Sequence, residues 1–218
     1  MLQRIFNYDN VVFRTITKIG YIWWLNILWV IFSLPVVTIG ASTTALLYSC
    51  MKLKKEEGYC TKNFLKSFKE NFKQSTAIFL LFVIVGALLA VNLVFWNQTG
   101  GTLGKTVKMF VIAASVPYFL TLLYVFAVQA RFVNTVKRTI QYAFVLAVKN
   151  FIWTFQMAII MAAVIYLNFT WLVANYVTLS IGAGVVAYFM CAYYNRIFTP
   201  YIEAAEKTAA EEMGGTEN

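Results

Sequence analysis

The sequence predicts an all-α fold: a polytopic helical membrane protein with five to six membrane segments. Hydrophobic residues make up 61% of the chain and charged residues only 12%, whereas about 25% of the residues of a soluble domain are charged. Several uncharged runs reach about 20 residues, which is long enough for a helix to cross a bilayer core. The sequence lacks the short segments of alternating polarity that are typical of transmembrane barrels. We therefore expect the lipid bilayer to be the main partner of this chain.

The first hydrophobic stretch, residues 19–51, contains no charged side chain. As one straight helix it would be about 50 Å long, which is too long for a single upright span. Pro35 disfavours helix at Leu34 and is expected to break the stretch. Thr38 is then expected to cap a second helix, and Gly40 permits close helix packing. Two alternatives remain: one kinked span with the N-terminus outside, or two short antiparallel helices with the N-terminus inside.

The positions of the basic residues distinguish these alternatives, because cytoplasmic loops of membrane proteins carry an excess of lysine and arginine. Five spans would place the following basic residues outside: Arg4, Arg14, Lys18, Lys105 and Lys108. Six segments would leave only the last two outside. The charge pattern therefore favours six segments, with both termini in the cytoplasm.

The six membrane segments are expected at residues 12–34, 37–52, 62–97, 106–130, 140–168 and 175–197. Together they form a single helical membrane domain, residues 1–198. Residues 97–104 are rich in glycine and polar side chains and are expected to form an outer loop. Residues 199–218 carry mainly glutamate charges and are expected to form a short acidic cytoplasmic tail. No cleavable signal peptide is expected, because the apolar region begins too late and runs too long.

A lysine-rich segment, residues 52–75, gives the strongest indication of the cytoplasmic side. Phenylalanines recur at every fourth position within it, which predicts an amphipathic helix. Two interpretations stay open: an interfacial helix lying among the lipid headgroups, or a docking surface for a cytoplasmic partner. The residues of the docking interpretation are Phe64, Phe68, Asn71 and Phe72.

Several functional classes are disfavoured by the composition. The formal net charge is +9, but the basic residues flank apolar spans, so no nucleic-acid partner is expected. The chain has no histidine, which excludes Ser-His catalysis and HExxH metal sites. No cofactor, metal site or enzymatic activity is expected. The three cysteines form no CxxC pair, and their odd number fits a reducing compartment without disulfides.

The uncharged stretches within the predicted spans, for example residues 76–96, contain polar residues but no Asp, Glu, Lys or Arg, which argues against proton coupling. The simplest interpretation of the polar residues is hydrogen bonding and close packing between helices. The alternative is a ligand cavity at the helix break, where freed backbone groups and aromatic rings would bind a sugar or a peptide. The residues of this second interpretation are Asn26, Leu34, Pro35, Thr38, Gly40 and Thr44.

Three stretches carry a resemblance to a known family: LPVVTIG at 34–40 following Asn26, ASTTALLY at 41–48, and NFLKSFKENFKQ at 63–74. With them the chain resembles the YesL-like family, small bacterial integral membrane proteins of unknown function. The resemblance implies a multi-pass protein of the bacterial plasma membrane. It also implies partners, because members are often encoded beside carbohydrate ABC importers and sugar-responsive sensor kinases. It supplies no catalytic residues.

The leading hypothesis is a non-enzymatic accessory or regulatory subunit of a carbohydrate ABC import system. One alternative is a small-solute channel or carrier that works without an intramembrane ionisable residue. A second alternative is a structural envelope protein. Oligomerisation is compatible with each hypothesis.

Overall fold

The computed structural model describes residues 11–99 and 101–214, which form helices and short connections without any β-strand. The helices are α2 (Val11–Ser33), a 3₁₀ turn (Val36–Thr38), α3 (Ile39–Lys54), α4 (Cys60–Gln98), α5 (Gly101–Arg131), α6 (Val136–Lys149), α7 (Phe151–Thr170), α8 (Leu172–Val177), a π-helical segment (Thr178–Gly182) and α9 (Ala183–Gly214). Six helical segments of this part of the chain are long and apolar enough to cross a membrane. The predicted fold class, an all-α polytopic membrane protein, is therefore confirmed.

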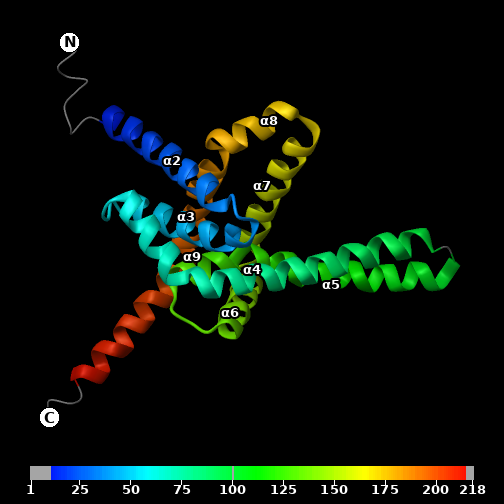
Figure 1. Ribbon diagram of the computed structural model, residues 1–218. Coiled ribbons are helices and arrows are strands. Elements are labelled where there is room, and N and C mark those ends of the chain that lie inside the picture. Colours follow the sequence, from blue (N-terminus) through cyan, green and yellow to red (C-terminus); the bar gives the residue numbers. More distant parts are fainter. Residues whose placement is uncertain (1–10, 100, 215–218) are drawn as a thin grey trace.

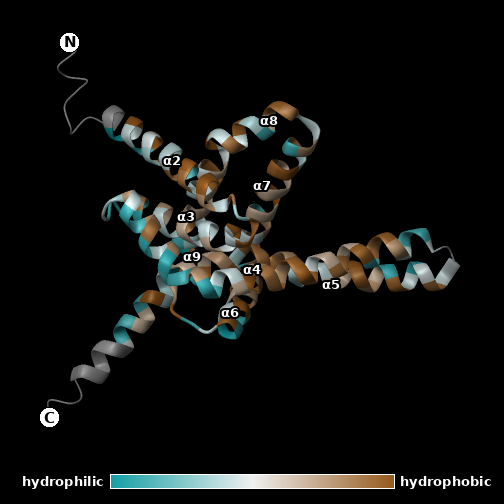
Figure 2. Cartoon of the chain, in the orientation of Figure 1, coloured by the Kyte–Doolittle hydropathy of each residue, from teal (hydrophilic) through white to brown (hydrophobic). Residues whose placement is uncertain are grey.

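The helices radiate from a common centre (Figure 1). The α4–α5 hairpin extends far to one side, α7 and α8 rise on another, and the end of α9 points away from both. Helix α3 lies at the centre, and most of its residues are buried. The core forms around it from apolar residues of α2, α4, α5 and α9. Figure 2 shows mostly hydrophobic residues along the part of the α4–α5 hairpin that extends from the centre, and hydrophilic residues near its tip.

The first hydrophobic stretch is a hairpin of two antiparallel helices rather than one kinked helix. Near the turn, the Ser33 and Ser42 hydroxyls are 2.6 Å apart. Further along, Trp29 Nε1 donates a hydrogen bond to Thr43 Oγ1 at 3.2 Å. At the open end, Arg14 pairs with Glu56 at 2.5 Å. The break lies at Pro35, as predicted.

The turn of this hairpin is held by Thr38, although not in the predicted way. Its hydroxyl does not cap the first N–H groups of α3. Instead, Thr38 Oγ1 donates to the carbonyl oxygens of Phe32 and Pro35, each at 2.6 Å. The carbonyls at the end of α2 lack helical partners, and this hydroxyl satisfies one of them.

The α4–α5 hairpin has a much shorter connection than the predicted loop at 97–104, because α4 ends at Gln98 and α5 begins at Gly101. Tyr118 OH donates to the carbonyl of Phe82 at 2.9 Å. Near the tip, Lys108 Nζ donates to Asn97 Oδ1 at 2.7 Å. A positive φ of 90° at Gly101 lets the chain reverse within this short connection.

The predicted segment 140–168 is two helices, α6 and α7, which break at Asn150 with φ −108° and ψ 43°. The Asn150 side chain donates to the carbonyl of Leu146 at 3.0 Å. Thr154 Oγ1 donates to the carbonyl of Ala147 at 2.8 Å. The Leu146 carbonyl also accepts the N–H of Asn150, whereas the Ala147 carbonyl lies in the last turn of α6, where Thr154 supplies a partner. A corner therefore replaces a continuous span.

The described part of the predicted tail at 199–218 is not a separate element. Helix α9 continues through Pro200 to Gly214. Alanine and glutamate, which are strong helix formers, dominate the residues after this proline. Residues 215–218 lie outside the described residues.

Candidate functional site

Two residues of the predicted ligand site, Gly40 and Thr44, lie in the contact between α3 and α4. Thr44 Oγ1 lies 2.9 Å from Ser75 Oγ, which joins α3 to α4. At Gly40 the two helices approach so closely that a Cβ atom would lie 2.5 Å from the Ser75 carbonyl oxygen. Thr44 is fully buried, whereas Leu34 is 75% exposed on the turn. The arrangement supports the packing interpretation of these residues.

Asn26 connects α2 to the C-terminal part of the chain. Its Nδ2 donates to the carbonyl of Leu179 at 2.7 Å, and its Oδ1 accepts from the N–H of Gly184 at 2.8 Å. These backbone groups are five residues apart, which is the spacing of a π-helical hydrogen bond. The buried amide thus inserts into the helical ladder where the π segment meets α9. Gly184 permits this approach, since a Cβ atom there would lie 2.7 Å from the Ile22 carbonyl oxygen.

The predicted docking phenylalanines are placed differently from the prediction. Phe64 is fully buried, and its ring centroid lies 5.5 Å from that of Phe32 on α2. Phe68 also packs on Phe32, at 4.8 Å. Only Phe72, which is 38% exposed, offers its ring to the surroundings. The amphipathic helix predicted from the spacing of the phenylalanines is present, but Phe32 of α2 covers most of its aromatic face.

Asn71 belongs to a chain of hydrogen-bonded side chains between α4, α5 and α6. Gln129 is 3% exposed, and its Nε2 donates to Asn71 Oδ1 at 2.9 Å and to Gln74 Oε1 at 2.7 Å. Thr139 Oγ1 donates to Gln129 Oε1 at 3.1 Å. The amide nitrogen of Gln74 has no acceptor in the described part of the chain, so its donors remain available to a ligand.

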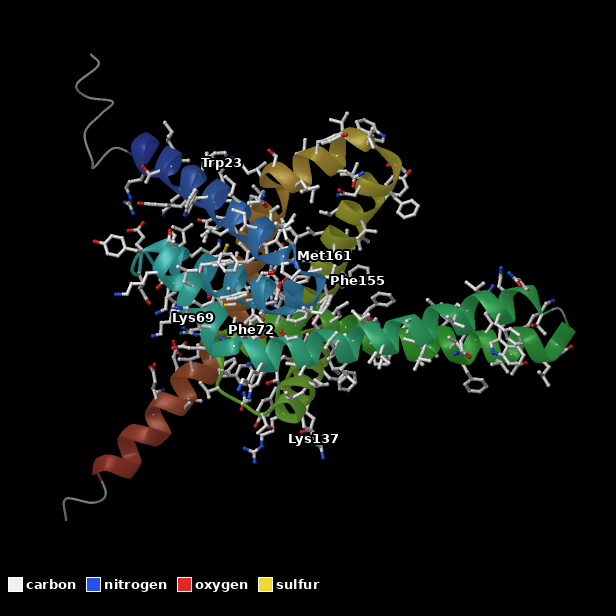
Figure 3. The ribbon with its side chains drawn as sticks, viewed as in Figure 1. Trp23, Lys69, Phe72, Lys137, Phe155 and Met161 are labelled. Carbon is white, nitrogen blue, oxygen red and sulfur yellow. The ribbon has the colours of Figure 1, made fainter. Side chains whose placement is uncertain are left out.

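A hollow of about 910 Å³ opens beside this chain of amides, between α4 and the end of α5. We call it the basic hollow. Its lining residues include the charged Lys69, Glu70, Lys73 and Arg131, the amide Gln74, and the apolar Phe72 and Val133. Its three cations form no ion pair with a described carboxylate. Figure 3 shows Lys69 and Phe72 on neighbouring turns of α4. The hollow therefore presents positive charge and N–H donors beside two exposed apolar side chains, Phe72 and Val133.

A second hollow, of about 670 Å³, lies among α3, α5, α7 and α9. Its wall is almost entirely aliphatic and aromatic, for example Leu122, Met161 and Val186. The indole of Trp29 is already bonded to Thr43, and the hydroxyl of Tyr194 to the carbonyl of Leu123. This hollow offers few hydrogen-bonding groups to a polar ligand.

The connection between α3 and α4 carries an ion-pair cluster. Glu56 has a positive φ of 59° and lies 2.5 Å from Arg14 and 2.9 Å from Lys18. Hydrogen bonds from Lys18 and Arg14 lower the pKa of Glu56 from 4.5 to about 2. Glu57, in the same connection, pairs with Lys52 of α3. The pairs of Glu56 fasten the start of α2 to the connection that follows α3.

The basic hollow could not be predicted from the sequence, because Arg131 lies more than fifty positions after Lys69 and Lys73. The amide-rich segment NFKQ at 71–74 and Gln129 near the end of an apolar span were visible signals. Nothing local indicated that they pair. Among the described residues, no group of three or more Cys, Asp or Glu side chains is placed to hold a metal ion.

Comparison with known proteins gives one match. The model of a family described as "Protein of unknown function, DUF624" matches residues 22–93, about a third of the chain. This segment contains the second half of α2 with Asn26, all of α3 and most of α4, so this part of the chain is similar to that family. Searches of curated proteins and of solved structures returned no match.

Proposed function

We propose that this protein is a YesL-like protein of the bacterial plasma membrane, with both termini in the cytoplasm. It acts as a non-enzymatic accessory subunit of a carbohydrate ABC import system or of the sensor kinase that regulates one. The basic hollow is the docking site for that partner. The partner contributes an acidic cytoplasmic segment with an apolar side chain.

The excess of positive charge in the basic hollow is the observation that supports this proposal most directly. Lys69, Lys73 and Arg131 outnumber the single carboxylate, Glu70, in the lining. Unpaired cations attract an acidic partner and orient its approach. Phe72 and Val133 add exposed apolar contacts, and an aromatic ring beside basic residues is typical of the energetic centre of an interface. A docking site of this kind needs no catalytic group.

The resemblance to the YesL-like family supports the choice of partner, because its members are often encoded beside carbohydrate importers and sugar-responsive kinases. The match to a family of unknown function over residues 22–93 includes the α4 side of the hollow. The carrier alternative has less support, because the interior hollow of about 670 Å³ has an apolar wall. A sugar needs several hydrogen-bonding partners when it loses its hydration.

Co-purification from native bacterial membranes in a mild detergent tests the proposal. The tagged wild-type protein is expected to retain an importer subunit or a sensor kinase, identified by mass spectrometry. The double substitution Lys69→Glu and Lys73→Glu is expected to remove it. The matched control, Lys105→Glu with Lys108→Glu, reverses two charges at the distant tip of the α4–α5 hairpin and is expected to keep the partner.

Three outcomes contradict the proposal: no importer or kinase component with the wild type, equal recovery with both double variants, or solute uptake by the purified protein in proteoliposomes. Transport by the protein alone would identify a carrier instead of an accessory subunit.

A further inference from the structure

The α2–α3 hairpin exposes a large apolar surface that no other described element covers. The exposed side chains on it include Trp23 (49%), Trp24 (42%), Ile31 (52%), Leu34 (75%) and Val36 (67%). Figure 3 shows Trp23 on the side of α2 that faces away from α3. In a membrane protein, such a surface either crosses the bilayer or lies within part of it.

The contacts with α4 determine how far this hairpin reaches. From the open end of the hairpin to its turn, its contacts move steadily along the sequence from the α3–α4 connection into α4. Lys18 pairs with Glu56, which precedes α4. Trp24 Nε1 donates to Thr61 Oγ1 at 2.9 Å, and Phe32 packs on Phe68. At the start of α3, a Cβ atom on Gly40 would lie 2.6 Å from Phe79 Cβ. The hairpin thus lies beside the lysine-bearing half of α4, and its turn reaches the level of Phe79.

The uncharged half of α4 extends well beyond that level. From residue 80 to Gln98 the helix continues for about 28 Å at 1.5 Å per residue. This part packs against α5, through Tyr118 on Phe82 and Lys108 on Asn97. The last charged residue before it is Lys73. A bilayer core about 30 Å thick, which takes about 20 helical residues, therefore begins only a few residues before Phe79.

We infer that the α2–α3 hairpin does not cross the bilayer but is embedded in the leaflet on the lysine side. It enters and leaves on that side, and its turn at Leu34 and Pro35 dips into the acyl chains. The bilayer is crossed by four segments: α4, α5, α7, and the segment formed by α8 and α9. This arrangement leaves both chain ends on one side and does not depend on the proposed docking function.

The chemistry of the hairpin fits anionic phospholipid as the occupant of its exposed surface. Tryptophan and tyrosine are favoured at the boundary between headgroups and acyl chains. Five cations lie at the open end against two carboxylates, Glu56 and Glu57: Arg14, Lys18, Lys52, Lys54 and Lys55. Basic residues at this depth attract the acidic lipids of the cytoplasmic leaflet. The apolar turn between Leu34 and Val37 has no charge that would keep it in water.

Cysteine accessibility distinguishes an embedded hairpin from a crossing pair. The three native cysteines are buried, so they give little background with a membrane-impermeant maleimide. We expect Leu34→Cys to stay unlabelled in intact cells and in permeabilised cells. The control Gln98→Cys, at the tip of α4–α5, is expected to react from outside. The control Tyr59→Cys, 82% exposed on the α3–α4 connection, is expected to react only after permeabilisation.

A second measurement shows what surrounds Leu34. A fluorophore attached to Leu34→Cys is placed in vesicles of phosphatidylcholine and phosphatidylglycerol that carry a nitroxide on the acyl chain. Strong quenching by this lipid is the expected result; Val36→Cys provides a second position if the first variant does not fold. Reaction of Leu34→Cys with maleimide from outside would show that the hairpin crosses and would overturn the inference. Reaction from the cytoplasmic side, or an absence of quenching, would also overturn it, because the turn would then lie in water or against protein.

Discussion

The close contact of Gly40 with α4 predicts that adding a methyl group at this position destabilises the α3–α4 interface. Replacing this glycine by alanine adds a Cβ atom that would lie 2.5 Å from the Ser75 carbonyl oxygen and 2.6 Å from Phe79 Cβ. Both atoms belong to helix α4, either in its backbone or directly attached to it, so neither can rotate away. The two helices must move apart by several tenths of an ångström. This displacement disturbs the neighbouring Thr44–Ser75 contact at 2.9 Å.

Two opposing effects determine how much Gly40→Ala changes the free energy of unfolding. Overpacking of a well-packed interior costs about 1–3 kcal/mol, whereas replacing glycine by alanine inside a helix gains about 1 kcal/mol. Gly20 on α2 distinguishes the overpacking cost from the gain in helix propensity, because a Cβ atom there meets nothing within 4 Å. Gly20→Ala therefore carries the propensity gain alone. We expect Gly40→Ala to be less stable than Gly20→Ala by about 1–3 kcal/mol, which is roughly a 5- to 150-fold change in the unfolding equilibrium.

Reversible unfolding in mixed detergent micelles, followed by tryptophan fluorescence, measures this difference. Both variants are compared with the wild type under identical micelle composition. If Gly40→Ala proved as stable as Gly20→Ala, the close α3–α4 crossing described here would be wrong.

Three further predictions concern the hairpin and its neighbours. Asn26→Ala removes two intramembrane hydrogen bonds and is expected to lower the free energy of unfolding by about 1–3 kcal/mol. Asn92→Ala removes a bond to Leu88 in its own helix, the one hydrogen bond of this side chain among the described residues, and is expected to change the free energy of unfolding by less than about 0.5 kcal/mol. Equal losses in the same unfolding assay would contradict the role of Asn26. Phe64→Ala empties a fully buried site and is expected to cost about 3–5 kcal/mol, whereas Phe72→Ala is expected to keep stability near that of the wild type and to weaken partner recovery; the opposite pattern would reverse the assignment of the two rings. Because the pKa of Glu56 is lowered from 4.5 to about 2, its ion pairs stabilise the protein fully above pH 4.5 and are lost as the pH falls towards 2. The thermal stabilities of the wild type and Glu56→Gln should then differ above pH 4.5 and converge at about pH 2, and a difference that does not depend on pH would exclude this cause.

The helical class and the break at Pro35 could be predicted because both follow from local sequence. Long uncharged runs require internally bonded helices in a bilayer, and proline cannot continue the ladder of α2. The charge pattern also gave the correct choice between one kinked helix and two antiparallel helices. Basic residues indicate which loops lie on the cytoplasmic side, and this indication does not require knowledge of which helices pack together.

Features that depend on distant contacts could not be predicted. The spacing of Phe64, Phe68 and Phe72 revealed an amphipathic face, but only the structure shows that Phe32 covers it. The role of Asn26 depends on a partner at Leu179, 153 positions away. The corner at Asn150 escaped notice because uncharged residues continue on its C-terminal side. Hydropathy alone does not distinguish such a corner from a continuous span.

The central functional claim is that the basic hollow receives a partner protein. Its most direct test is a photoactivatable amino acid placed at Phe72 and irradiated in native membranes. We predict an adduct with a subunit of a carbohydrate importer or with a sensor kinase, which disappears when Lys69→Glu and Lys73→Glu are added. An adduct with neither kind of protein, or one that also forms from Phe110 on the distant half of α5, would contradict the claim.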